Sequence, residues 1–119
     1  MRYMLLIYGN ENGLSQDARE KCYEESARLT HDLKAEGKFY SAAPLHSVAR
    51  AVSVRLRDGK PIVTDGPFAE THEQLGGYYM IEADSTDEAI AIASRIPGVK
   101  WGTVEVRPVV ELAGLPEQS

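Results

Sequence analysis

Two short apolar runs, residues 3–8 and 78–81, most constrain how this chain can fold. Each run places apolar or aromatic side chains on both faces of an extended strand, and such strands normally lie in the middle of a sheet. The chain has 119 residues, which is enough for one two-layer domain and too few for two. We therefore expect one domain over residues 1–110, with these strands at the centre of its sheet, and a tail over residues 111–119.

Residues 16–36 have the pattern of an amphipathic helix, capped by Ser15 and ended by Gly37 in the C′ position. The inward-facing stripe of this helix is predicted to be Cys22, Ser26, Leu29 and Leu33. Ser26 is the one hydroxyl on the stripe. It either bonds back to the helix backbone or faces a polar environment, such as a pocket or a subunit boundary. Cys22 is the only cysteine, so an intrachain disulfide is excluded and we expect it to pack in the core or at an interface.

Three extended segments are predicted between this helix and the second central strand: residues 38–45, 49–57 and 60–64. Alternation in the middle segment puts its apolar side chains on one face, which we expect to be buried. These side chains are Val52, Val54 and Leu56. Asp58-Gly59 is typical of a two-residue type I′ hairpin turn, in which both residues need a positive φ.

A second helix begins with a capping box formed by Ser85 and Glu88, and we expect it to run as far as Pro97. The last strand is predicted over residues 103–110. The resulting order is the ferredoxin-like βαββαβ plan of an α+β protein, in which helices cover one face of an antiparallel sheet. Because the other face would expose apolar side chains, we expect a homodimer packed sheet to sheet, with clefts near its edges.

The composition excludes several classes of function. The net charge is −5 and the basic residues are scattered, which argues against nucleic acid and against an anionic membrane surface as partners. The first apolar run is too short for a signal peptide or a membrane span, so we expect a cytoplasmic location. Phosphate-loop and dinucleotide fingerprints are absent, as is a CxxC pair, and no cofactor is expected.

The connection that leads into the second central strand is long and polar, whereas connections between strands are usually only a few residues long. Its length therefore calls for a structural or a functional explanation. Asp65 precedes Gly66-Pro67, where its carboxylate either holds a structural turn or acts as a general base at a pocket mouth. Phe68 is expected to anchor the loop in the core. The glycine pair at 76–77 lets the backbone come close to a ligand or to another part of the chain.

Other side chains of this connection, and a few outside it, are candidates for a site. Glu70 and Glu73 share a face if the segment forms a helical turn. We predict Asp65 and His72 as catalytic residues. The predicted ligand-binding residues are Ser26, Glu70, Glu73, Tyr79 and Arg107. The structural alternatives are a solvated charge for Arg107 and core packing for Tyr79. Asp65, Glu70 and His72 match no dedicated metal motif, so no metal is expected.

The motif Asp65-Gly66-Pro67-Phe68 and several flanking segments resemble the DGPF type of YCII-related protein. The matching segments are residues 1–9, 57–60, 64–79, 87–89, 96–98 and 104–109. The resemblance implies the dimeric α+β barrel, in which two ferredoxin-like sheets face each other. Some relatives carry a His on the first helix, paired with an Asp as an acid–base dyad. Ser26 stands at that position here, so the dyad does not carry over.

Two functions follow as hypotheses from the residues and the resemblance together. One is a cofactor-free acid–base enzyme, of lyase, isomerase or hydrolase type, that acts on a small molecule in a dimer cleft. The other is a non-catalytic metabolite-binding or regulatory module. Its dimer cleft would sense a metabolite, and the resemblance implies a link to sigma-factor signalling, because DGPF-type members are often encoded beside extracytoplasmic-function sigma factors.

Overall fold

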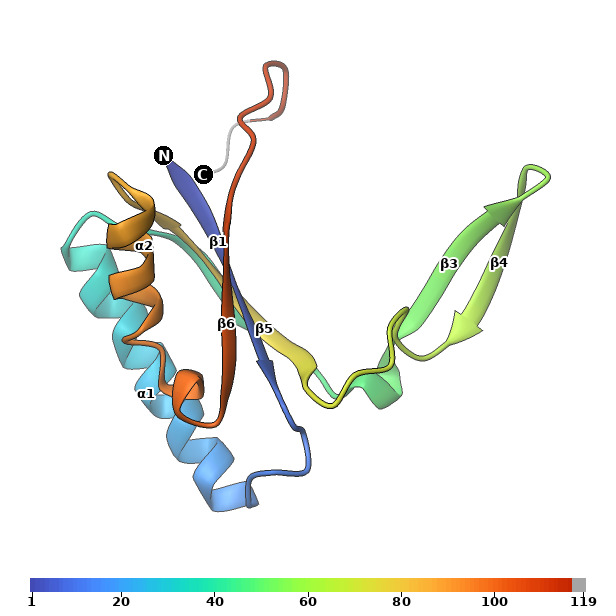
Figure 1. Cartoon of the computed structure of the whole chain (residues 1–119), viewed down its shortest axis with the longest axis horizontal. Helices are drawn as coiled ribbons and strands as arrows, with labels where there is room; N and C mark the ends of the chain where they lie inside the picture. Colours follow the sequence, from blue (N-terminus) through green and yellow to red (C-terminus); the bar gives the residue numbers. More distant parts are fainter. Residues whose placement is uncertain (117–119) are drawn as a thin grey trace.

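The structure is a computed structural model that describes residues 1–116. Its main sheet is antiparallel with the strand order β2-β5-β1-β6, so the two predicted central strands do lie at its centre. These strands are β1 (Arg2–Gly9), β2 (Phe39–Pro44), β5 (Gln74–Glu82) and β6 (Gly102–Pro108). Two helices, α1 (Gln16–Ala35) and α2 (Thr86–Ala93), cover one face of the sheet (Figure 1). The protein therefore has the α+β ferredoxin-like fold predicted from the sequence.

The core lies between the helices and the sheet. Leu5 and Ile81 from the central strands and Leu33 from α1 are completely buried there. The cap of α1 is the predicted one: the Ser15 hydroxyl accepts a hydrogen bond from the backbone N–H of Ala18. Gly37 follows the helix with a φ of +74°, as a C′ glycine should. The local signals of this helix therefore predicted its ends correctly.

The second helix starts as predicted and ends earlier than predicted. The Ser85 hydroxyl accepts from the N–H of Glu88, which is the capping contact expected from the sequence. The helix ends at Ala93, however, and residues 97–100 form a separate short 3₁₀ turn, η2 (Pro97–Lys100). Pro97 disfavours the helical conformation of the residue before it, so the helix ends upstream of the proline.

The central strands are fully buried on one face only, as the plan with helices on one face of the sheet predicts. Their alternate side chains are half-exposed on the side away from the helices. These side chains are Met4, Leu6, Tyr78 and Met80, and we call the surface they form the open sheet face. Because these strands are apolar on both faces, the single chain leaves an apolar surface uncovered.

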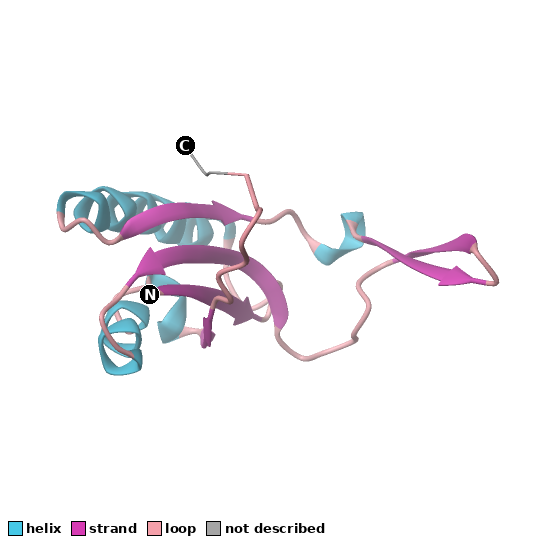
Figure 2. Ribbon diagram, turned by 90° about the horizontal axis from the view of Figure 1, so that it is seen from above, coloured by secondary structure: helices cyan, strands magenta, loops and turns pink. Residues whose placement is uncertain are grey.

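The segment between β2 and β5 leaves the sheet. It contains a 3₁₀ turn, η1 (Val48–Arg50), and the hairpin of β3 (Val52–Arg57) and β4 (Lys60–Asp65), which pair only with each other. Figures 1 and 2 show this hairpin, which we call the arm (residues 52–65), projecting away from the sheet and helices. Asp58 and Gly59 at its tip have φ values of 51° and 76°, which confirms the predicted type I′ turn.

The prediction that one face of the middle strand is buried is wrong. Val52, Val54 and Leu56 are 61%, 61% and 74% exposed. The alternation of the sequence was interpreted correctly as a strand with one apolar face. That face meets nothing in the single chain, because the hairpin extends beyond the sheet instead of joining it.

No helix within residues 1–116 is long and apolar enough to cross a membrane.

Candidate functional site

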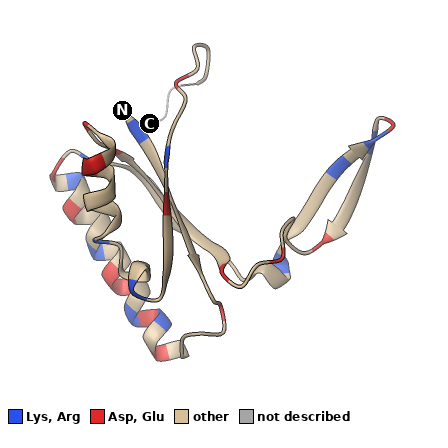
Figure 3. Ribbon diagram, in the orientation of Figure 1, with Lys and Arg blue, Asp and Glu red and all other residues tan. Residues whose placement is uncertain are grey.

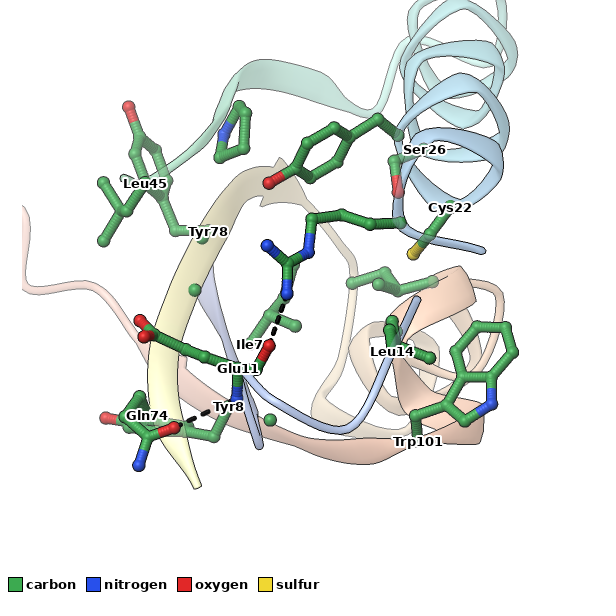
Figure 4. Close-up of a pocket in the computed structure, with 18 of the residues that line it drawn as sticks. Ile7, Tyr8, Glu11, Leu14, Cys22, Ser26, Leu45, Gln74, Tyr78 and Trp101 are labelled. Carbon is green, nitrogen blue, oxygen red and sulfur yellow. Dashed lines mark hydrogen bonds between the residues drawn. The ribbon is translucent and has the colours of Figure 1, made fainter. Parts of the chain in front are cut away.

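A cavity of about 710 Å³ lies between the N-terminal half of α1 and one end of the sheet (Figure 4). The loop over residues 10–14, which joins β1 to α1, forms one wall, and the segment after β2 forms another. Cavities of this size are typical of sites for small molecules. The β1–α1 loop and the segment between β2 and η1 therefore both shape the cavity.

Aromatic residues from three different parts of the chain line the cavity on the helix side of the sheet. Tyr23 comes from α1, Tyr79 from β5 and Trp101 from the turn before β6. Large aromatic surfaces favour flat, apolar ligands, and their polar atoms help to orient such a ligand.

The wall formed by residues 10–14 is held in place by side-chain hydrogen bonds. The Glu11 carboxylate accepts from the Ser47 hydroxyl at 2.9 Å and from the N–H of Val48 at 2.8 Å, at the start of η1. The Gln74 side chain accepts from the N–H of Glu11 at 3.1 Å. Because the Glu11 carboxylate bonds both Ser47 and Val48, it holds this loop against the start of η1.

Arg19 supplies a positive charge to the cavity. Its guanidinium donates to the backbone carbonyl oxygen of Glu11 and lines the cavity from the first turns of α1. Sequence reasoning singled out neither Glu11 nor Arg19. Folding alone brings these two residues to the cavity, and neither belongs to a motif that marks it.

Two of the predicted ligand-binding residues meet at this cavity. Ser26 and Tyr79 both line it, and the Tyr79 hydroxyl donates to the backbone carbonyl oxygen of Ser26 at 2.8 Å. Burial raises the pKa of the Tyr79 phenol, and the hydrogen bond to Ser26 opposes this rise. Of the two readings of Ser26, the structure agrees with the one in which its face of α1 borders a pocket.

Cys22 lies one turn before Ser26 on the same face of α1 and also lines the cavity. Burial raises the pKa of the Cys22 thiol, and a hydrogen bond with Ser26 opposes this rise only in part. The raised pKa disfavours the thiolate, which makes this thiol a poor nucleophile.

The other predicted site residues lie outside the cavity. Asp65 ends β4, and Glu70 and His72 follow it in the irregular segment over residues 66–73; all three are exposed. That segment is not a helical turn, which corrects the expectation for Glu70 and Glu73. The Glu73 carboxylate instead accepts from the Thr103 hydroxyl at 2.9 Å.

Arg107 is also outside the cavity. It pairs with Met4 across β6 and β1, at the margin of the open sheet face.

The DGPF motif closes the base of the arm. The N–H of Gly66 donates to the carbonyl oxygen of Ala51 at 2.8 Å, and the Ser53 hydroxyl donates to the carbonyl oxygen of Gly66 at 2.9 Å. Gly66 has a φ of +101°, a conformation that other residues rarely adopt. Phe68 is 78% exposed, so the expectation that it anchors the loop in the core is wrong. Its ring lies instead under the Arg55 guanidinium, 5.1 Å from the ring centre.

Among residues 1–116, no three His, Cys, Asp or Glu side chains lie close enough together to hold a metal ion.

Comparison with known proteins adds a family and a structural relative. Residues 1–113 match the model of the YCII-related domain. A protein of Rhizobium meliloti (strain 1021), itself described as uncharacterized, is 39% identical over 118 residues, with 92% of each chain covered.

Among solved structures, the 5-chloro-2-hydroxyhydroquinone dehydrochlorinase from Burkholderia phenoliruptrix AC1100, in complex with 2,5-dihydroxybenzoquinone, is similar with a TM-score of 0.56. Its sequence is 17% identical, and the match covers 92% of this chain and 94% of that one. At this level of identity the likeness shows that the two proteins share a fold.

Proposed function

The chain belongs to the YCII-related family, and from that premise we propose that it binds a small ring-containing molecule in the cavity beside α1 and acts on it as a cofactor-free acid–base enzyme of lyase type. The observation that carries this proposal is the combination of aromatic walls with a cation and protic groups in one cavity of about 710 Å³. Such a mixture of apolar surface and a few convergent polar groups is typical of small-molecule sites.

The side chains of the cavity suit a ring that bears oxygen substituents. Tyr23, Tyr79 and Trp101 offer flat surfaces for the ring, and Arg19 offers positive charge for an oxygen that becomes negative during the reaction. The Cys22 thiol and the Ser26 hydroxyl are protic groups within the same cavity and can hydrogen-bond such oxygen substituents.

The structural relative supports the class of ligand in this proposal. That protein is a dehydrochlorinase and was solved with a dihydroxylated quinone, which is a small flat ring with oxygen substituents. The likeness concerns the fold, so the argument for this chain rests on its own cavity.

Fluorescence of Trp101 provides a direct binding test, because it is the only tryptophan and it lines the cavity. We expect 2,5-dihydroxybenzoquinone to change this fluorescence saturably. At a ligand concentration about 100 times the Kd, the complex should gain roughly 2.7 kcal/mol of stability, and Tm should rise by several degrees.

A pair of variants on α1 tests whether binding occurs in this cavity. Ser26→Leu adds bulk to the cavity wall and should abolish both signals, whereas Glu24→Leu, exposed on the same helix, should retain them. Equal binding by the two variants contradicts the proposed site. Saturable binding of ring compounds without any turnover contradicts the enzymatic part of the proposal alone.

The predicted catalytic roles of Asp65 and His72 are tested separately, since both lie outside the cavity of their own chain. A catalytic Asp65 predicts that Asp65→Asn loses turnover while its Tm stays close to that of the wild type. If Asp65 only holds a structural turn, Asp65→Asn should keep its turnover and show a lower Tm than the wild type.

We further propose that the functional unit is a homodimer packed sheet to sheet. The open sheet face supports this, because Met4, Leu6, Tyr78 and Met80 would otherwise leave an apolar surface in contact with water. Light scattering at micromolar concentration is expected to give twice the chain mass of 13.1 kDa. A monomer contradicts the proposal.

A further inference from the structure

The arm has two chemically different faces. In the β3–β4 register, Val54 pairs with Val63 and Leu56 pairs with Pro61, so these side chains project from one face together with Val52 and Asp65. Arg55, Arg57 and Lys60 project from the other face, with Ser53, Ile62 and Thr64. One face is thus apolar with a single carboxylate, and the other carries three cations.

From this arrangement we propose that the arm packs its apolar face on the body of a second copy of the chain, within the homodimer proposed above. The inference rests on that homodimer and adds the surface that the arm contributes to it.

The apolar face of the arm needs a covering surface. A two-stranded hairpin has no core of its own and is marginally stable in water when isolated. Within the chain, the basic face receives a contact, since Arg55 stacks on Phe68. Val54, Leu56 and Val63 on the apolar face stay 61%, 74% and 62% exposed. A row of apolar side chains this exposed marks an interaction surface.

The position of the arm favours a second copy as its partner. Figures 1 and 2 show the arm leaving the sheet on the side away from α1 and α2, which is the side of the open sheet face. A copy that covers the open sheet face therefore lies next to the arm. By the two-fold symmetry of a dimer, each arm then reaches the body of the other copy.

Charge complementarity favours the same partner. The arm carries three cations and two carboxylates, a net charge of +1, so the rest of the chain carries −6 (Figure 3). An arm is therefore attracted to the body of another copy and repelled by another arm. This argues against arm-to-arm association as the way to cover the apolar face.

Two neighbouring positions on β4 provide a matched test. Val63→Lys puts a charge on the apolar face, and Thr64→Lys puts the same side chain on the opposite face, one residue away. Both native side chains are exposed in the single chain, so both variants should fold, which circular dichroism verifies. Sedimentation equilibrium then measures the dissociation constant of the dimer. Val63→Lys should raise it at least about tenfold, and Thr64→Lys should leave it close to that of the wild type.

Met80→Lys, on the open sheet face, separates this inference from the homodimer itself. If Met80→Lys dissociates the dimer while the two arm variants behave alike, the sheet-to-sheet dimer stands and the role of the arm is overturned. Equal loss of the dimer in Val63→Lys and Thr64→Lys overturns the assignment of the apolar face. A monomeric wild type overturns both the arm and the homodimer, and none of these results depends on a ligand.

Discussion

The Tyr79 hydroxyl donates a 2.8 Å hydrogen bond to the backbone carbonyl oxygen of Ser26, and this bond joins β5 to the middle of α1. On the N-terminal side of this contact, α1 and the sheet enclose the cavity. On the other side, Leu29 and Leu33 pack into the core. The bond therefore marks the boundary between the packed and the open half of the α1–sheet interface.

Replacing Tyr79 by Phe is expected to lower stability, because it removes this hydrogen bond while keeping the ring. A buried hydrogen bond contributes about 0.5–1.5 kcal/mol, so Tm should fall by a few degrees. Thermal unfolding followed by circular dichroism measures the effect. Tyr40→Phe is the control, since its hydroxyl reaches Glu82 only at the surface. Equal Tm values for the two variants would contradict a structural role of the Tyr79 contact.

Gly77→Ala should destabilise the protein, and Gly76→Ala should not. A Cβ at Gly77 would lie 2.9 Å from the carbonyl oxygen of Ala43 on β2, whereas one at Gly76 would meet only the carbonyl oxygen of Ile7, at 3.9 Å. The close approach permitted by the glycine pair is thus used by the chain itself. Overpacking against backbone costs about 1–3 kcal/mol, which urea unfolding resolves. Similar midpoints for the two variants would rule out this tight contact.

Acid should remove a contribution of the ion pair between Glu36 at the end of α1 and Arg95. The hydrogen bond from Arg95 lowers the pKa of Glu36 below its ordinary value of 4.5. Stability from a lowered pKa is present in full above the ordinary value and is lost as the pH falls through the folded-state value. The Tm difference between wild type and Glu36→Gln should therefore be largest near neutral pH and vanish in acid. A difference that does not change with pH argues against the pair.

Cys22 should react slowly with iodoacetamide at pH 8. Burial raises the pKa of its thiol above the ordinary value of 9.0, and the thiolate is the reactive form. The rate should keep rising with pH beyond that value, and a ligand in the cavity should protect the thiol. Mass spectrometry of the alkylated protein measures the rate, with the urea-unfolded chain as reference. Equal rates for the folded and the unfolded protein at pH 8 contradict the burial of this thiol.

Much of the fold was predictable because its signals are local. Ser15 and Gly37 mark the ends of α1 through contacts within a few residues, and Asp58-Gly59 specifies a tight hairpin turn. The central place of β1 and β5 followed from their apolar character. The prediction failed where the outcome depends on what a surface meets: the apolar face of the arm was read as buried.

The candidate site was less accessible to the same reasoning. Ser26 attracted attention as the one hydroxyl on an apolar stripe, and Tyr79 as an aromatic residue of a central strand, and both line the cavity. Glu11 and Arg19 carry no pattern that marks them. Asp65 was predicted as catalytic from the DGPF motif and His72 from the connection that follows it. In the structure, Gly66 of the motif closes the base of the arm.

The amino-acid order alone was sufficient for the element types, the turn of the hairpin and the ferredoxin-like plan, because caps, turns and hydrophobic periodicity act over a few residues. The cavity beside α1 and the departure of the arm from the sheet required the folded chain. Residues 7, 22, 79 and 101 border one space only after β1, α1, β5 and the turn before β6 have packed. Packing is a long-range property, and hydrophobic periodicity records which face avoids water without recording what covers it.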